Sequence, residues 1–108
     1  MISEVDVRTF IAAHADGAHV LDVREPHEYE AGHVPGARLV PLSTVPDVAR
    51  ELPIGPTIYV ICESGSRSRT AAAHLARIGH DVRAVIGGTS SWVSAGRPVV
   101  RGLRANIA

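Results

Sequence analysis

The sequence of 108 residues contains a single cysteine, Cys62, and no lysine. One cysteine excludes an intramolecular disulfide and any zinc site built on several cysteines. A lone thiol is typical of a reducing compartment, and the amino terminus has no signal-peptide pattern, so we expect the cytoplasm. No apolar run approaches the ~18 residues that a membrane span requires, and no contact with a membrane is expected.

Net charge is also absent, because 11 basic residues balance 11 acidic ones. A balanced chain has no general attraction for a polyanion, so nucleic-acid binding is not expected. Five of the histidines lie on separate predicted elements without metal-ligand spacing and are expected at the surface: His14, His19, His27, His74 and His80. We therefore expect neither a metal site nor a cofactor.

Short apolar runs alternate with helical patterns, which is typical of a parallel α/β sheet in one domain. Strands are predicted over residues 19–23, 38–40, 57–61 and 82–86, and helices over 5–15, 26–31, 43–52, 66–78 and 89–95. Ser3 stands at the expected N-cap of the first helix. The run TIYVI at 57–61 lacks polar alternation, which indicates a strand buried on both faces. No element is predicted over 99–108.

Cys62 directly follows this buried strand, and a short loop leads from it into the next helix. Ligands of open α/β sheets bind beyond the carboxyl ends of the strands. Backbone N–H groups ahead of a helix N-terminus can converge on an anion, and such a setting lowers a cysteine pKa. The thiolate is the nucleophilic form, and Arg67 would add a fixed cation to the same loop. The alternative interpretation is an inert cysteine buried at a strand end.

The segment Cys62-Glu63-Ser64-Gly65-Ser66-Arg67-Ser68 resembles the active-site loop of single-domain rhodaneses, a Cys-x-x-Gly-x-Arg-Ser pattern. Residues 21–37 and 87–98 resemble the N-terminal and C-terminal motifs of that family. The resemblance covers about residues 2–100, so we expect a rhodanese-like domain over 1–100 and a tail over 101–108. It implies a five-stranded parallel sheet flanked by helices on both faces.

The resemblance implies a sulfurtransferase that takes a sulfane sulfur from a small donor such as thiosulfate. The sulfur would be held as a persulfide on Cys62 and passed to cyanide or to a thiol acceptor, either a small thiol or a dithiol protein. Cys62 would be the nucleophile, and Arg67 would close the loop and bind the anion. The candidate substrate-binding residues are Glu63, Ser64, Gly65, Ser66 and Ser68, whose backbone N–H groups would stabilise the persulfide.

Glu63 departs from the family pattern, because many relatives carry Arg or Gln directly after the cysteine. A carboxylate at this position would repel an anionic donor and would tend to raise the pKa of Cys62. Glu63 therefore counts against a preference for thiosulfate, whereas the rest of the loop favours the same sulfur chemistry.

Several other residues resemble catalytic groups but are expected to be structural. Asp22 and Arg24 end a strand, where Arg24 would pair with Glu28 and Asp22 would accept loop amides. His33 is expected to be a structural loop residue. Trp92 is expected in the core, and Gly87-Gly88 is expected to form a turn because it lacks the phosphate-loop pattern.

Other functions remain open beside sulfur transfer. A non-catalytic docking module of the same fold is one, although the presence of both Cys62 and Arg67 counts against it. A phosphatase or arsenate reductase of the Cys-loop-Arg type is another. Phosphatase loops of that type separate the two residues by one position more than the four found here, Glu63 to Ser66, and a lone cysteine leaves an arsenate reductase without a resolving thiol.

Overall fold

The computed structural model describes residues 2–106, in which five strands form one sheet. The strands are β1 (Glu4–Val5), β2 (His19–Asp22), β3 (Arg38–Leu39), β4 (Thr57–Ile61) and β5 (Asp81–Val85), in the spatial order β1-β5-β4-β2-β3. The helices are α1 (Val7–Ala15), α2 (Pro26–Ala31), α3 (Val45–Glu51), α4 (Ser66–Ile78) and α5 (Gly88–Ser94), with a 3₁₀ turn over Leu42–Thr44. All paired strands are parallel. The predicted fold class and five-stranded parallel sheet are confirmed.

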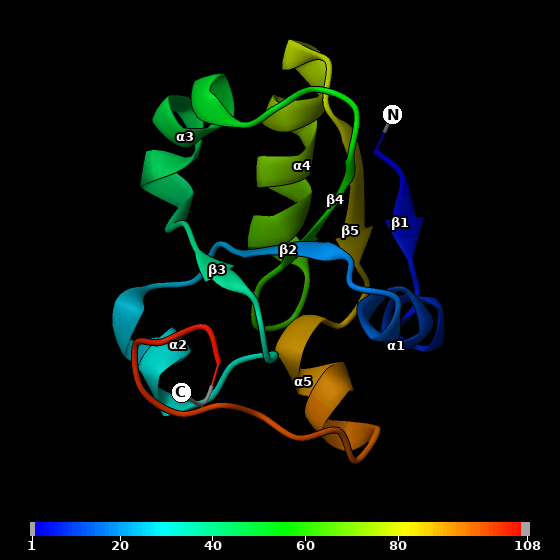
Figure 1. The fold of residues 1–108 in the computed structure, drawn as a ribbon, viewed down its shortest axis with the longest axis vertical. Helices are drawn as coiled ribbons and strands as arrows, with labels where there is room; N and C mark the ends of the chain where they lie inside the picture. The colour runs from blue at the N-terminus through cyan, green and yellow to red at the C-terminus, as the bar shows by residue number, and fades with distance from the viewer. Residues whose placement is uncertain (1, 107–108) are drawn as a thin grey trace.

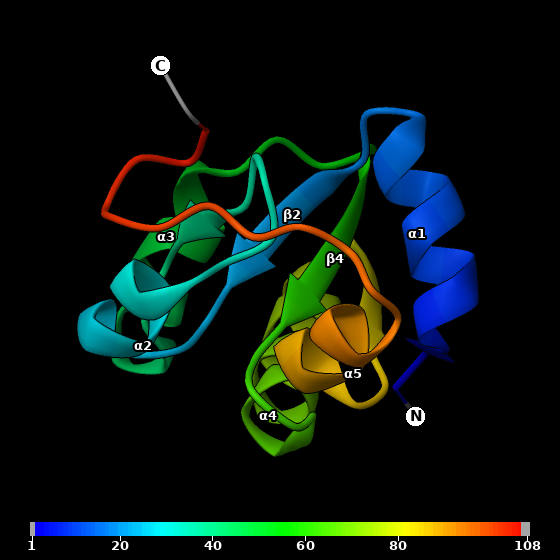
Figure 2. The same ribbon diagram turned by 90° about the horizontal axis from the view of Figure 1, so that it is seen from below.

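Helices cover both faces of the sheet, as the two ribbon views show (Figure 1 and Figure 2). One face packs against α1, α2 and α5 through Phe10, Tyr29 and Trp92, so the predicted core position of Trp92 is confirmed. The other face packs against α3 and α4, whose buried apolar side chains include Ala49 and Leu75. Alternate residues of β4 enter the two clusters, which is why its sequence shows no polar alternation.

The start of the chain differs from the prediction. Glu4 and Val5 form β1, so Val5 does not open the first helix, and Asp6, not Ser3, caps that helix by accepting a hydrogen bond from Thr9 N at 2.8 Å. The strand exists because it pairs with β5, where Ala84 N donates to Ser3 O at 2.9 Å. A strand of this length has no periodicity of its own, so only its partner distant in sequence defines it.

Other boundaries move by one or two residues. The predicted helix over 43–52 is a 3₁₀ turn followed by α3, because Pro46 is tolerated only in the first turn of an α-helix. The surface position predicted for His80 is wrong: the ring is buried and its Nε2 lies 2.9 Å from Ala49 O. Among residues 2–106, no helix is long and apolar enough to cross a membrane.

The segment after α5 runs back along the domain to the loop that follows α2 (Figure 1). Val100 and His33 form an antiparallel bridge, and Gly36 N donates to Ala105 O at 2.9 Å. Of the tail predicted over 101–108, positions 107 and 108 lie outside the described residues. The described part therefore lies against the domain.

Candidate functional site

The site lies where three adjacent strands of the parallel sheet end. Cys62 follows β4, Arg24 lies two residues beyond β2, and Gly87 and Gly88 come directly after the residue that follows β5. The chain leaves β4 for α4 on one face and leaves β2 for α2 on the other. Such a change of direction between neighbouring strands opens a crevice at their carboxyl ends, and this is where ligands of α/β sheets bind.

The thiol of Cys62 is buried and surrounded by hydrogen-bonding groups. The residue is 1% exposed, Gly65 N donates to Sγ at 3.1 Å, and Ser68 Oγ lies 3.6 Å from Sγ. Burial raises the pKa of Cys62, but a hydrogen bond with the Ser68 side chain and hydrogen bonds from the N–H groups of Ser68, Gly65 and Arg67 outweigh it. The pKa of the thiol therefore lies below its usual value, which favours the thiolate.

The first residues of α5 donate backbone hydrogen bonds to the carbonyl groups of the Cys62 loop. Thr89 N donates to Cys62 O at 2.8 Å, and Ser90 N donates to Glu63 O at 3.1 Å. Gly88 has a φ of +55°, and a Cβ at this position would collide with the Cys62 carbonyl oxygen. The Gly87-Gly88 turn is therefore a close backbone contact with the reactive loop, a role that the sequence prediction of a simple turn did not include.

The guanidinium of Arg67 pairs with Glu28 of α2 in a two-pronged contact. Nη1 lies 2.6 Å from Oε1 and Nη2 lies 2.9 Å from Oε2. This pairing lowers the pKa of Glu28 to about 2. In this structure Arg67 thus ties the loop to α2 by its side chain and contributes its backbone N–H to the Cys62 thiol.

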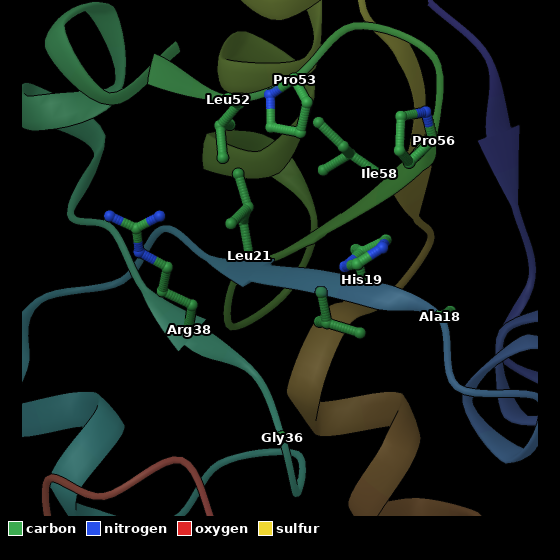
Figure 3. A pocket seen from close by; sticks show the side chains of 10 residues that line it. Ala18, His19, Leu21, Gly36, Arg38, Leu52, Pro53, Pro56 and Ile58 are labelled. Atoms are coloured by element: carbon green, nitrogen blue, oxygen red, sulfur yellow. The ribbon is translucent and has the colours of Figure 1, made fainter.

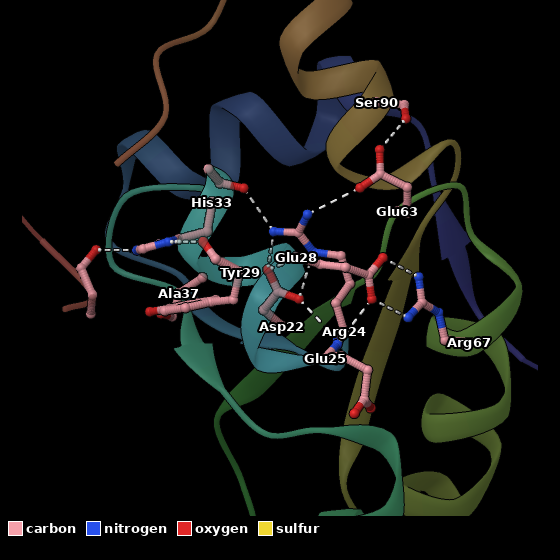
Figure 4. A network of polar contacts seen from close by, with 12 residues as sticks. Asp22, Arg24, Glu25, Glu28, Tyr29, His33, Ala37, Glu63, Arg67 and Ser90 are labelled. Atoms are coloured by element: carbon pink, nitrogen blue, oxygen red, sulfur yellow. Dashed lines mark hydrogen bonds and ion pairs between the residues drawn. The ribbon is translucent and has the colours of Figure 1, made fainter. Parts of the chain in front are cut away.

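Arg24 is buried and joins three parts of the site (Figure 4). Its Nη2 donates to Asp22 Oδ2 at 2.8 Å and to Gly32 O at 2.9 Å, and its Nη1 donates to Glu63 Oε1 at 3.0 Å. The predicted pairing of Arg24 with Glu28 is wrong, because Glu28 binds Arg67 instead. Asp22 does accept the predicted loop amide, from Arg24 N at 3.0 Å.

Glu63 is held by two neighbours. One carboxylate oxygen binds Arg24, and the other accepts a hydrogen bond from Ser90 Oγ at 2.8 Å, while 48% of the side chain stays exposed. Figure 4 shows the carboxylate directed toward Arg24 and Ser90. Its charge is partly balanced there, and the pKa of Cys62 is lowered overall, so the predicted rise in that pKa is not found.

The remaining predicted residues occupy different parts of the loop. Ser64 and Ser66 are exposed, whereas Ser68 is buried, and its hydroxyl donates to Gly65 O at 2.9 Å. Gly65 precedes α4 with a φ of +122°. His33 is structural in its contacts: its ring stacks on Tyr29, and its Nε2 lies 2.7 Å from Arg104 O.

Sequence reasoning missed the partners that hold the loop. The sequence predicts Thr89 and Ser90 only as the start of a short helix, and it pairs Glu28 with Arg24 instead of Arg67. One general rule indicates which segments meet at the site: the carboxyl ends of parallel strands lie at the same edge of a sheet. That rule places the residues after β2 beside those after β4 once the strand order is known.

A groove of about 470 Å³ adjoins the loop, bordered by Arg24, Glu28 and Glu63 and further lined by Thr89, Val99 and Arg101. A second hollow of about 260 Å³ lies at the opposite edge of the sheet, at the amino ends of β2 and β4, where His19 and Ile58 line it (Figure 3). No cluster of residues suited to a metal ion occurs within 2–106. Cys62 does not line the groove, which adjoins the loop through Glu63.

Comparison with known proteins gives one consistent family. The model of the rhodanese-like domain matches residues 6–95. The thiosulfate sulfurtransferase GlpE of Pseudomonas entomophila is 36% identical over 85 residues, 78% of each chain. The putative sulfur carrier protein YrkF of Bacillus subtilis is 41% identical over 78 residues, 71% of this chain but 42% of YrkF. Among solved structures, a rhodanese-related protein of Thermoplasma volcanium aligns with a TM-score of 0.85 and 30% identity, over 94% of this chain and 99% of that one.

Proposed function

Because the chain belongs to the rhodanese-like domain family, whose members include sulfurtransferases, we propose that it carries a sulfane sulfur as a persulfide on Cys62. The observation that carries the proposal is the setting of the thiol. Cys62 is the only cysteine, it lies at the carboxyl edge of the sheet, and hydrogen bonds from Ser68 and the loop lower its pKa. A thiolate held in this way is a nucleophile ready to attack sulfur.

In the loading step, the Cys62 thiolate attacks the outer sulfur of a donor such as thiosulfate. The sulfur–sulfur bond of the donor breaks, a new one forms to Sγ, and sulfite leaves with the electron pair. The product is an anionic persulfide, and the N–H groups that surround Sγ are positioned to stabilise its charge.

In the discharge step, an acceptor thiolate attacks the outer sulfur of the persulfide, and the Cys62 thiolate leaves. The acceptor departs as its own persulfide, and no external oxidant or reductant is consumed. Since the chain has no second cysteine, the acceptor must come from outside it. A small thiol or a dithiol protein meets this requirement.

The alternatives are less well supported. A docking module needs no lowered thiol pKa and no ordered ring of donors around Sγ. A phosphatase needs an arginine that reaches the bound phosphate. In this structure, Nη1 and Nη2 of Arg67 both donate to the Glu28 carboxylate.

The test is mass spectrometry of the intact protein after incubation with thiosulfate or another sulfane donor. We expect an adduct of about 32 Da, one sulfur atom, on the wild type, because the thiolate is the reactive form. Cys62→Ala should show none. An unmodified wild type across several donors would contradict the proposal, as would an adduct that persists in Cys62→Ala.

A further inference from the structure

We infer that the second hollow, at the amino ends of β2 and β4, is a binding site for a short apolar carboxylate. The hollow lies at the edge of the sheet opposite to Cys62, so this site is separate from the proposed sulfur transfer. Its floor is apolar, its wall is rigid, and the two basic side chains that line it have no partner.

The floor of the hollow consists of buried apolar side chains. Leu21 of β2 and Ile58 of β4 line it and are only 5% and 4% exposed. Both belong to the core cluster on the face that α3 and α4 cover. The volume of about 260 Å³ lies just below the range of about 300–1,000 Å³ that is usual for small-molecule sites, so the ligand must be small.

The wall of the hollow is the segment that connects α3 to β4. Leu52, Pro53 and Pro56 line the hollow from this segment. Figure 3 shows Leu52, Pro53 and Ile58 gathered on the side of β2 that carries Leu21. Because each proline fixes its own φ, the connection has little backbone freedom. A wall that is already fixed loses little conformational entropy when a ligand enters.

Both ionisable side chains that line the hollow are basic. Arg38 of β3 pairs with Leu21, and His19 precedes Leu21 by two residues, so all three side chains lie on one face of the sheet. Figure 3 shows Arg38 and His19 on opposite sides of Leu21. Within residues 2–106, neither basic side chain forms an ion pair or a hydrogen bond, and no acidic residue lines the hollow.

This combination selects the class of ligand. A carboxylate would give the planar guanidinium of Arg38 the two-pronged partner that the protein does not provide. An apolar body of the ligand would then cover Leu21 and Ile58. A phosphate or a nucleotide would place further charged oxygens against this apolar floor without hydrogen bonds, which is unfavourable.

The experiment is a chemical-shift titration of the ¹⁵N-labelled full chain with three probes. Phenylacetate carries both the carboxylate and an apolar ring, phenylacetamide lacks the charge, and acetate lacks the ring. We expect saturable shifts with phenylacetate at millimolar concentrations, largest at the amides of His19, Leu21 and Arg38. Phenylacetamide and acetate should each bind about five-fold more weakly or less, because each makes only one of the two contacts.

Arg38→Gln should weaken phenylacetate binding about three- to ten-fold and leave phenylacetamide unchanged. Its melting temperature should equal that of wild type, because the Arg38 side chain is exposed and has no partner among residues 2–106. Arg50→Gln is the matched control, since Arg50 is an exposed arginine of α3 that does not line the hollow, and it should bind phenylacetate as wild type does.

Three outcomes would overturn the inference: no saturable shift with phenylacetate, shifts confined to the loop around Cys62, or equal weakening in Arg38→Gln and Arg50→Gln. The last would show a general effect of charge instead of a site. None of them bears on sulfur loading at Cys62, which is measured by mass.

Discussion

At the scale of single residues, the chemistry of the site depends on short hydrogen bonds around one sulfur atom. The charged side chains nearby are already paired with each other: Arg67 with Glu28, and Arg24 with Asp22 and Glu63. The thiolate is therefore favoured by the hydrogen-bonding groups of the loop more than by a free cation. Removing a hydrogen-bonding group should therefore change the pKa of Cys62, whereas removing a charge should change the use of an anionic donor.

Ser68→Ala should raise the pKa of Cys62, because it removes the side-chain hydrogen bond with Sγ that favours the thiolate. Alkylation by iodoacetamide, followed against pH, should shift to higher pH and become several-fold slower near neutrality. Ser94→Ala, at the exposed end of α5, controls for the loss of a serine hydroxyl elsewhere. Identical pH profiles for Ser68→Ala and wild type would exclude this role for Ser68.

Glu63→Gln should improve the use of thiosulfate only slightly. The carboxylate is half exposed and already pairs with Arg24, so much of its repulsion of a dianion is balanced. We expect the KM for thiosulfate to fall about three-fold, equivalent to ~0.6 kcal/mol. Steady-state kinetics at low and high salt check this, since an electrostatic gain shrinks as salt rises. A KM that is unchanged at low salt would assign Glu63 to another role.

At the scale of elements, the reactive loop is held by two helices. It leads directly into α4, and the first residues of α5 donate hydrogen bonds to its carbonyl groups. Gly65 starts α4 with a backbone conformation that other residues avoid, and Gly88 lets α5 approach the Cys62 carbonyl. The loop therefore keeps its shape through backbone contacts from two helices that are separated in sequence by β5.

Gly88→Ala should destabilise the protein and reduce sulfur loading. Its Cβ would lie 2.7 Å from Glu63 O and would also collide with the Cys62 carbonyl, so the loop must move. Gly96→Ala is the matched control, because Gly96 also has a positive φ of +77° but faces open space. Chemical denaturation should show a loss of ~1 kcal/mol for Gly96→Ala and at least ~2 kcal/mol for Gly88→Ala. Equal losses would show that the close contact is unimportant.

At the scale of the whole molecule, ion pairs connect the ends of β2 and β4 to α2. Arg24 links Asp22 to Glu63, and Arg67 links the loop to Glu28. Since these contacts hold together segments from the two halves of the chain, their protonation state affects the stability of the fold as well as the site.

The pairing of Glu28 with Arg67 predicts a loss of stability in acid. The folded-state pKa of Glu28 is lowered to about 2 from its usual 4.5, so its contribution is present above pH 4.5 and is lost as pH falls toward about 2. The pair is partly exposed, at 22% and 33%, and water weakens it. The melting temperature of Glu28→Gln should fall less than that of wild type across this range.

Glu30→Gln provides the comparison for this measurement, because Glu30 is an exposed carboxylate of the same helix without an ion pair among the described residues. Its melting curve should follow wild type through the acid range. If Glu28→Gln and Glu30→Gln behave alike, the ion pair with Arg67 does not contribute to acid stability.

The sequence by itself determined the fold class, most of the elements and the position of the reactive loop. These are local properties: the apolar run of β4 predicts a buried strand, the pattern over 66–78 predicts α4, and Cys62 stands between them. The motif around Cys62 resembles the active-site loop of rhodaneses, and this resemblance, which a short run of residues carries, points to sulfur chemistry. The boundaries of α4 match the predicted range for the same reason.

Only the tertiary structure decided which groups meet. β1 exists because β5 pairs with it, and Glu28 binds Arg67 instead of Arg24 because strand order brings α2 beside the loop. Three residues at the site come from segments more than twenty residues further along the chain, and no local sequence pattern predicts their position: Thr89, Ser90 and Arg101. Helices and turns follow from neighbours along the chain, whereas charge pairing and the groove depend on distances across the folded sheet.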